Sequence, residues 1–244
     1  MRRSFCSFML ALFAVSTVVI PCTADTPAKT TAEILKQQER NTVSLELEFT
    51  KKSPNALQRV ISFLNWGPNG YATGFMVGGH LMMTAYHVVS GDLDDSKKLA
   101  LGFAREDHLE VKVYLNGCKA KVLKVDPEAD LALLEACSEA KQSATPLFQA
   151  TVTKNEKLML IARPHGDRIV SQGTFYGAYA FRGIDYWSVK ITARDGFSGS
   201  PVYNEQGEVV GVFSGYDWSK KLALVSPGMR AQKLIAAVTG STHP

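Results

Sequence analysis

Alternating apolar and polar residues constrain the fold of this chain more than any other feature. The alternation runs through residues 43–49, 111–115 and 187–191. Because successive side chains of a β-strand point to opposite faces of the sheet, a period of two predicts strands with one buried face. Short apolar runs separated by Gly, Pro, Asn and Asp turns lie at 131–134, 158–161, 209–213 and 222–225. The pattern predicts a many-stranded, all-β protein, either a sandwich or a barrel.

Helix signals lie mainly at the two ends of the chain. Thr30-Thr31-Ala32-Glu33 has the form of a capping box and predicts a short helix that runs to about Arg40. Ser226-Pro227 predicts the start of a second helix that runs to Gly240. Between the helices, the polar stretch 138–145 indicates a seam between two halves of the β structure. No internal repeat or low-complexity segment is evident.

The size and composition of the chain are typical of a globular protein. Its 244 residues are 45% apolar, which is enough for one large domain or two small ones. Lysine and arginine total 27 against 23 acidic residues, and the formal net charge of +4 falls to about +2 if the two N-terminal arginines are removed. No basic tract is long enough to indicate a nucleic-acid partner.

Residues 1–24 have the order of a secretory signal peptide. Arg2 and Arg3 precede an apolar run from Phe5 to Ile20, and the segment 21–24 ends in small residues. We expect cleavage after Ala24 and export to the periplasm or the medium. The mature chain would then begin with a helical extension at 25–41, followed by a globular domain at 42–240.

Three other interpretations of the N-terminus remain open. The apolar run is about 16 residues long, whereas a membrane-spanning helix needs about 20, so a retained anchor is less favoured than a cleaved signal. Lipid attachment at Cys22 is less favoured because Val19-Ile20-Pro21 lacks the small residues that this processing prefers. A twin-arginine export signal also contains an Arg-Arg pair, although the short charged segment and the strong apolar run favour ordinary secretion. We expect no stable membrane span after cleavage.

Export would place two remaining cysteines, Cys118 and Cys137, in an oxidising compartment. They flank two predicted strands, 119–125 and 131–136, and the turn 126–129 lies midway between them. A hairpin of these strands would bring the cysteines face to face. We therefore predict a Cys118–Cys137 disulfide, with two buried free thiols as the alternative. A zinc site is not expected, because no second Cys or His lies at ligand spacing beside either cysteine.

Three further segments contain the side chains that a serine nucleophile needs. A serine hydroxyl requires a histidine base, a carboxylate that orients the base, and N–H donors for the developing oxyanion. His87 follows a strand-like run in TGFMVGGHLMMTAYHVVS, and Asp130 lies at a turn-to-strand junction in VDPEADLALLEA. Ser198 lies beside a glycine in DGFSGSPVYNEQGEVVGVFSG, so the chain order is His, Asp, Ser.

These three segments resemble the trypsin-like (chymotrypsin-fold) serine peptidases, particularly the bacterial HtrA-type and glutamyl-endopeptidase-type branches, without the PDZ domain that HtrA-type enzymes often carry. In that family two antiparallel six-stranded barrels hold the catalytic residues in the cleft between them. The resemblance implies one barrel at about 42–140 and another at about 145–240. T-A-x-H-V at 84–88 implies His87 as general base, D-L-A-L-L at 130–134 implies Asp130 as the orienting carboxylate, and G-x-S-G-S-P at 196–201 implies Ser198 as nucleophile.

The resemblance also implies an oxyanion hole and a specificity pocket. The backbone N–H groups of Gly196 and Ser198 would form the oxyanion hole. By family position the substrate-binding residues are Thr192, Ala193, Phe213, Ser214, Gly215 and Ala223. Thr192 would form the base of the pocket, and Ser214 would support the substrate main chain and Asp130. Because none of these residues is acidic, the pocket favours a small or medium apolar side chain over Lys or Arg. Glutamyl endopeptidases have a histidine where this chain has Phe213.

Phe197 departs from the family pattern. Trypsin-like zymogens have an aspartate here that pairs with a newly cut N-terminus, and many bacterial members have an asparagine that braces the loop by hydrogen bonds. Phenylalanine can do neither. If Phe197 is buried, it must brace the loop by packing instead, so activation by a freed α-amino group is not expected. We favour a secreted or periplasmic serine endopeptidase, because all three catalytic side chains are present. The alternative is a non-catalytic binding module in which Phe197 holds the oxyanion hole collapsed.

Other candidate residues are assigned structural roles. Asp126 is a rival for Asp130, but it lies on the turn side and is predicted to cap the turn. The aspartates of 92–95 have incomplete ligand spacing for calcium, which favours a solvated turn. The remaining histidines lack the T-A-x-H-V setting of His87: His80, His108, His165 and His243. We expect a polypeptide substrate, no cofactor and no metal, while the sequence does not specify the physiological substrate or the oligomeric state.

Overall fold

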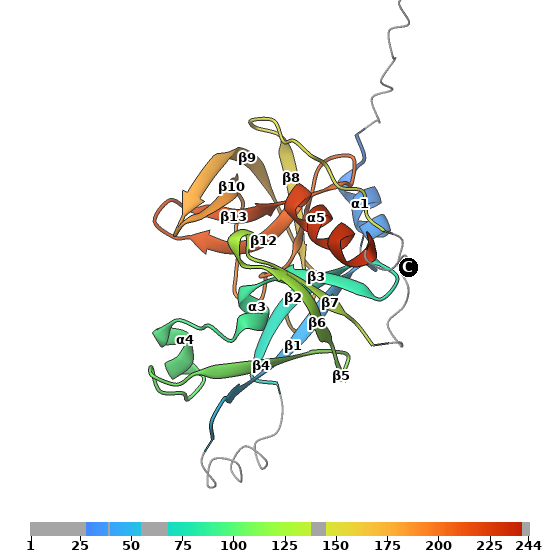
Figure 1. The fold of residues 1–244 in the computed structure, drawn as a ribbon. Coiled ribbons are helices and arrows are strands. Elements are labelled where there is room, and N and C mark those ends of the chain that lie inside the picture. The colour runs from blue at the N-terminus through green and yellow to red at the C-terminus, as the bar shows by residue number, and fades with distance from the viewer. Residues whose placement is uncertain (1–27, 39, 55–67, 138–144, 241–244) are drawn as a thin grey trace, which may run out of the picture.

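Two β bodies stacked one above the other make up the computed structural model, which describes residues 28–38, 40–54, 68–137 and 145–240 (Figure 1). In the described residues the first body is a seven-stranded sheet that curls into a half-barrel, with the order β5-β4-β1-β2-β3-β7-β6. Its strands are β1 (Thr42–Lys51), β2 (Gly70–Gly78), β3 (Leu81–Ala85), β4 (Leu109–Leu115), β5 (Cys118–Lys119), β6 (Lys121–Asp126) and β7 (Leu131–Glu135).

The second body is a closed barrel of six described strands in the order β10-β13-β12-β11-β8-β9. Its strands are β8 (Lys157–Ala162), β9 (Ile169–Phe181), β10 (Ile184–Lys190), β11 (Pro201–Tyr203), β12 (Val209–Asp217) and β13 (Leu222–Pro227). All paired strands within both bodies run antiparallel.

The prediction of an all-β protein with two bodies is confirmed, with one difference in detail. The first body is a curled seven-stranded sheet and not the expected closed barrel of six strands. The additional strand is β5, which forms a hairpin with β4 through Asn116 and Gly117. Both turn residues have positive φ, 51° and 76°, as the two-residue hairpin turn of type I′ requires.

The predicted terminal helices are both present. The capping box opens α1 (Thr31–Gln38): the Thr30 N–H donates to Glu33 Oε2 at 2.7 Å, and the Glu33 N–H donates to Thr30 Oγ1 at 3.3 Å. At the other end, α5 (Gly228–Thr239) follows β13 directly. Both helices contribute to the apolar cluster between the two β bodies, through Ile34 of α1 and Ala231 and Leu234 of α5. None of the helices in the described ranges is long and apolar enough to cross a membrane.

Short helices that the sequence did not predict lie in the connections. They are α3 (His87–Ser90), α4 (Asp95–Ala100), and the 3₁₀ turns η1 (Pro127–Ala129) and η2 (Pro164–Gly166). Asp94 caps α4 by accepting a hydrogen bond from the Lys97 N–H at 2.8 Å, so this carboxylate is a helix cap within the predicted turn.

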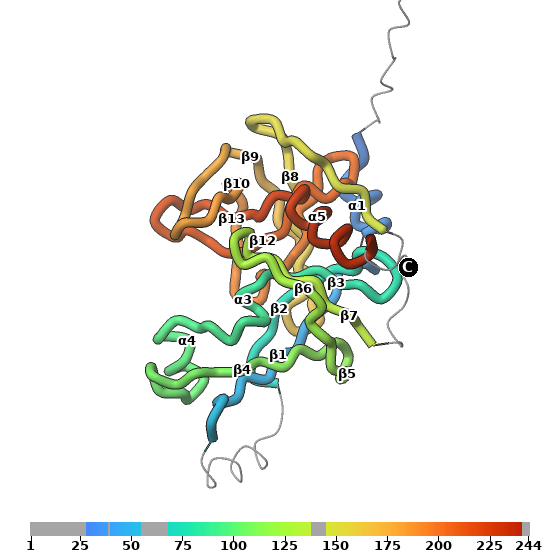
Figure 2. The backbone as a smooth tube through the Cα atoms, in the orientation of Figure 1, coloured from blue at the N-terminus to red at the C-terminus, as the bar shows by residue number. Residues whose placement is uncertain are grey.

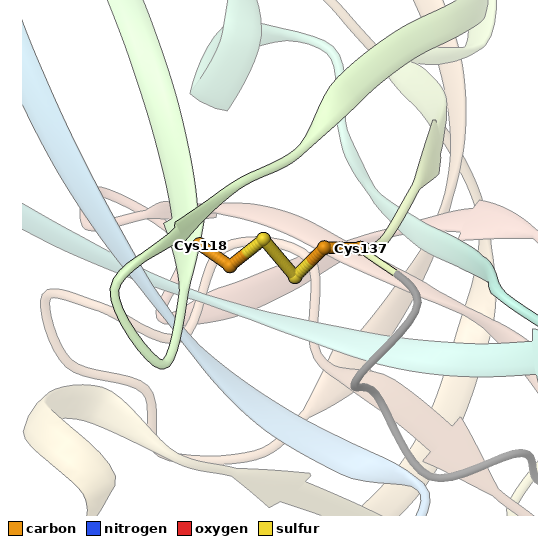
Figure 3. The surroundings of a disulfide bond; sticks show 2 residues. All are labelled: Cys118 and Cys137. Atoms are coloured by element: carbon orange, nitrogen blue, oxygen red, sulfur yellow. A yellow bond between two sulfur atoms is a disulfide. The ribbon is translucent and has the colours of Figure 1, made fainter.

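Cys118 and Cys137 form a disulfide, with their Cα atoms 6.2 Å apart (Figure 3). As predicted, β6 and β7 form the hairpin between them, with Lys121 opposite Glu135. The bridge therefore ties the β4–β5 corner to the end of β7, where the first body ends (Figure 3). The predicted seam at 138–145 lies almost entirely outside the described residues, as do the predicted signal peptide and Cys22.

Candidate active site

Strand register brings His87 and Asp130 together. Strand β3 pairs with β7 so that Ala85 lies opposite Leu131. His87 is the second residue after Ala85, and Asp130 immediately precedes Leu131, so both side chains emerge at the same end of this strand pair. In the backbone trace, α3, which His87 begins, lies at the boundary between the two β bodies (Figure 2).

Backbone and side-chain hydrogen bonds hold the aspartate against the histidine. Asp130 Oδ1 accepts from the His87 N–H at 2.9 Å, while Oδ2 lies 2.8 Å from His87 Nδ1. Asp130 follows η1 in the left-handed conformation, with φ of 51°, which non-glycine residues seldom adopt except Asn and Asp. Its carbonyl accepts from the Tyr86 N–H at 3.0 Å, so the backbone of Asp130 is also held by the residue that precedes the histidine.

Ser198 completes this chain of contacts. His87 Nε2 lies 2.8 Å from Ser198 Oγ. The aspartate side chain is 8% exposed, whereas the histidine side chain is 35% exposed. A buried carboxylate that fixes one ring nitrogen leaves the other nitrogen directed at a hydroxyl that solvent and a substrate can approach. The structure thus brings together all three side chains that the sequence singled out.

The nucleophile loop consists of two overlapping type II turns. In the first, the Phe197 N–H donates to the Arg194 carbonyl at 3.3 Å, and Gly196 has φ of 83°. In the second, the Ser200 N–H donates to the Phe197 carbonyl at 2.9 Å, and Gly199 has φ of 85°. A type II turn requires positive φ at its third residue, which explains the glycine at each position.

Two backbone donors of this loop are left free. Within the described ranges, neither the Gly196 N–H nor the Ser198 N–H donates a hydrogen bond to any residue. The other type of turn, type I, would rotate the Asp195–Gly196 peptide by about half a turn and point the carbonyl where the N–H now points. The type II turn is therefore the form in which this peptide offers a donor.

Phe197 is buried, which is the condition for a brace by packing, and it lies beneath the loop. Its side chain is 1% exposed and belongs to the apolar cluster inside the second barrel. The ring makes an edge-to-face contact with Phe213, at 6.3 Å between centroids. Phe213 also anchors the loop through its backbone, because its carbonyl accepts from the Gly199 N–H at 2.7 Å and its N–H donates to the Ser200 carbonyl at 2.8 Å.

Most of the predicted pocket residues are buried. Thr192 is exposed, but Ala193, Phe213 and Ala223 are buried in the same apolar cluster as Phe197. Gly215 follows a bulge in the pairing of β12 with β13, and the space beside its Cα is open. Two hollows of about 660 and 370 Å³ lie elsewhere, beside α5 and beside α1, and neither is lined by these residues.

Ser214 makes a different contact from the one expected. Its Oγ lies 2.8 Å from Ser226 Oγ, and Ser226 in turn donates to the Ala129 carbonyl. Ser214 therefore supports the segment that precedes Asp130, and not the carboxylate itself.

Tyr186 is a neighbour of the site that sequence reasoning missed. Its side chain is buried, and burial together with the charge of Asp130 raises its pKa, while a hydrogen bond with Ser214 acts in the opposite direction. The phenol is consequently neutral beside the carboxylate at ordinary pH. In the sequence, Tyr186 is one of several aromatic residues in a strand-like run, and nothing distinguishes it.

Asp126 has the capping role that was predicted for it. Its Oδ1 accepts from the Ala129 N–H at 3.2 Å, and both carboxylate oxygens also bind Arg230 of α5, at 2.8–3.0 Å. The competing assignment of Asp126 as partner of His87 is therefore wrong, because its carboxylate faces the helix.

Comparisons with known proteins show the family and the fold of the chain. The family of trypsin-like peptidase domains matches residues 72–212. A search of curated proteins finds no match. Among solved structures, Rv3671c from M. tuberculosis H37Rv, a serine-to-alanine mutant in an inactive form, is 17% identical, with a TM-score of 0.56 over 89% of this chain and 97% of that one. The Rv3671c protease, also in an inactive form, is 16% identical at TM-score 0.56, over 86% and 97% of the two chains.

Deg5 is similar to the same degree, with 15% identity and a TM-score of 0.56 over 83% of this chain and 90% of that one. At these identities the solved structures establish the fold, and the family match, which extends over more than half of the chain, establishes the family. The chain belongs to the trypsin-like peptidases.

Proposed function

We propose that this protein is an exported serine endopeptidase that cleaves polypeptides through an acyl-enzyme on Ser198. The single observation that supports the proposal most strongly is the unbroken chain from Asp130 through His87 to Ser198, with both contacts of the imidazole at 2.8 Å. Three separate segments of sequence meet in these two contacts. A structural histidine would not need a buried carboxylate on one nitrogen and a serine hydroxyl on the other.

The proposed reaction uses each group in turn. Asp130 accepts the Nδ1–H of His87, which leaves Nε2 unprotonated and able to take the proton of Ser198 Oγ as the oxygen attacks the peptide carbonyl. The protonated imidazole then donates to the departing amine, and the acyl group remains on Ser198. A water molecule, activated by the same nitrogen, hydrolyses the ester and regenerates the hydroxyl.

The Gly196 and Ser198 N–H groups are proposed as the oxyanion hole. Two observations support them: neither donates within the described residues, and the turn that presents the Gly196 N–H is of type II. Such donors act on charge that develops only in the transition state, and removing one costs about 10²–10³ in kcat. Buried Phe197 supports a loop that is folded ready for use, because no charged partner is needed to hold it.

We propose a small apolar side chain before the cleaved bond. No acidic residue stands at any of the inferred pocket positions. Ala193, Phe213 and Ala223 are already almost fully packed, at 5%, 3% and 0% exposure, which leaves little room for a long side chain. Export is supported by the order of residues 1–24 and by the disulfide, which is typical of an oxidising compartment.

Labelling with a fluorophosphonate tests the proposal against a non-catalytic binding module. The reagent phosphonylates a serine only when a base and an oxyanion hole activate it. We expect time-dependent labelling of the chain that begins after Ala24, and none of the Ser198→Ala variant with the same circular dichroism spectrum. A folded protein that is not labelled would favour the binding module with a collapsed oxyanion hole.

A further inference from the structure

We propose that Thr73 is a positioning residue that sets the spacing between the two donors of the oxyanion hole; the inference rests on the proposed function. Thr73 lies on β2, in the first β body, and its exposed fraction is 0%. The nucleophile loop connects β10 with β11 in the second body. One residue thus contacts the loop from the opposite side of the interface.

Thr73 bonds to both residues whose N–H groups form the proposed hole. Its backbone N–H donates to the Ser198 carbonyl at 2.9 Å, and its Oγ1 donates to the Gly196 carbonyl at 2.8 Å. The two carbonyls are therefore held by one residue, through two donor atoms, N and Oγ1, that are three covalent bonds apart. Because each carbonyl is attached to the residue that also carries the N–H, holding both carbonyls limits how far the two donors can move relative to each other.

The direction of the side-chain hydrogen bond is fixed by a third group. The Arg163 N–H, at the end of β8, donates to Thr73 Oγ1 at 3.0 Å. A backbone N–H can only donate and a carbonyl can only accept, so the hydroxyl hydrogen must point at Gly196. Pro164, the next residue, packs against Gly196 so closely that a Cβ on the glycine would lie 2.7 Å from the proline Cβ. Gly196 is therefore held between a hydrogen bond and a packing contact.

Thr73 is itself held in place by the segment that carries the histidine. Thr84 Oγ1, on β3, donates to the Thr73 carbonyl at 2.8 Å and also lies against Gly199 of the loop. Thr84 is 0% exposed and is the first residue of the T-A-x-H-V segment at 84–88, which contains His87. The two buried threonines link the histidine strand, the nucleophile loop and the end of β8 in one hydrogen-bonded unit.

This unit supplies the polar brace that Phe197 cannot supply. The Phe197 side chain packs against apolar neighbours and offers no hydrogen bond to the loop. The Thr73 hydroxyl, which belongs to the first β body, instead donates to the carbonyl of Gly196, the residue before Phe197. Removing the hydroxyl alone would release Gly196 while leaving Ser198 held by the Thr73 backbone, so the distance between the two donors would no longer be defined.

The test compares Thr73→Val, which removes the hydroxyl, with Thr73→Ser, which keeps it. Hydrolysis of a small peptide ester and inhibition by a peptide trifluoromethyl ketone, whose adduct carries an oxyanion, are measured for each. In Thr73→Val we expect kcat to fall by about tenfold or more and inhibitor affinity to fall with it, while KM stays within about twofold, because the hydroxyl does not touch substrate. Thr73→Ser should remain within about threefold of the wild-type kcat.

Thr42→Val is the matched control. Thr42 is another buried threonine of the first body, on β1, and in the described contacts its hydroxyl bonds to no residue of the nucleophile loop. Any loss of kcat that follows from a buried Thr→Val change in general would occur in this variant as well. A Thr73→Val enzyme with kcat unchanged, or with the same loss as Thr42→Val, would overturn the proposal. Thr73→Ala serves as the second hydroxyl-free variant if Thr73→Val does not fold.

A crystal structure of the hydroxyl-free variant separates this inference from the proposed function. We expect Gly196 to be displaced relative to Ser198, with the Ser198 carbonyl still bonded to the residue 73 N–H. If wild-type protein is not labelled by a fluorophosphonate, the proposed function fails. The displacement of Gly196 in the variant structure still tests whether Thr73 positions the loop. An unmoved Gly196 would refute the positioning role even if wild-type protein is active.

Discussion

Replacing Phe197 tests whether packing alone holds the nucleophile loop. The side chain is 1% exposed and lies edge-to-face with Phe213. Truncating a buried phenylalanine to alanine costs about 3–5 kcal/mol, since apolar contact is lost and a cavity is left. A single domain is stable by about 5–15 kcal/mol, so Phe197→Ala should remain folded but be measurably weaker. Phe197→Leu keeps most of the apolar contact and should lose about 1 kcal/mol, close to the worth of the aromatic pair.

The direction of the change in activity distinguishes a serine endopeptidase from a non-catalytic binding module. If the ring supports an open oxyanion hole, fluorophosphonate labelling and kcat should fall in Phe197→Ala and fall much less in Phe197→Leu. If the ring holds the hole collapsed, labelling should increase on truncation. Urea unfolding followed by tryptophan fluorescence gives the change in free energy, and labelling at a temperature where both variants are folded gives the rate. A loss of stability below about 1 kcal/mol in Phe197→Ala would refute the packing argument.

Three other predictions concern separate parts of the molecule. Gly196→Ala should lower kcat by about 10²–10³ with KM little changed, because φ of 83° is strained for alanine and the turn would lose its free donor. Steady-state kinetics, with kcat calculated per folded molecule, checks this. Replacing both disulfide cysteines with serine should lower the unfolding free energy by about 3 kcal/mol, from the entropy of a loop with a sequence separation of 19, and unchanged thermal stability would contradict this. Hydrogen bonds from Ser219 and Tyr179 lower the pKa of Asp217 to about 2, so the carboxylate contributes stability above pH about 3.8 that is lost as the pH falls through about 2; Tyr179→Phe should raise this pKa in an NMR titration, and an unchanged value would exclude the tyrosine as a cause.

Local sequence patterns predicted many of the strands. The alternation at 43–49 corresponds to β1, and the apolar runs at 131–134 and 222–225 correspond to β7 and β13. The hairpin of β6 and β7 could be predicted because the two cysteines and the turn between them lie symmetrically in the sequence. For each single strand the signal is contained in fewer than about ten consecutive residues, which is the range over which periodicity is informative, whereas the hairpin signal extends over residues 118–137.

The longest strand was missed because its composition is unlike that of a buried strand. Strand β9 runs from Ile169 to Phe181 and contains Gly173 and Gly177, and Phe175 is its one buried residue. A Cβ on Gly173 would lie 1.9 Å from the Lys190 carbonyl, so the glycine allows β10 to approach closely. This requirement arises from a neighbouring strand and leaves no trace in local hydrophobicity.

The candidate triad could be predicted from the sequence, whereas the residues that contact and position it could not. His87, Asp130 and Ser198 each lie in a recognisable motif, and the structure places His87 within hydrogen-bond distance of both Asp130 and Ser198. Thr73 and Tyr186 lie in ordinary strand patterns, and their contacts with the site depend on how the two β bodies face each other. Phe197 is buried, which met the condition for a packing brace, but its partner Phe213 was interpreted only as a substrate-binding residue.

The most direct test of the account is the mass of the protein during turnover of a p-nitrophenyl ester. We predict a burst of nitrophenol, together with a single added acyl group that peptide mapping locates on Ser198 and that is absent from Ser198→Ala. Folded protein that releases nitrophenol without a burst and carries no acyl group, or carries it on another residue, would contradict the account.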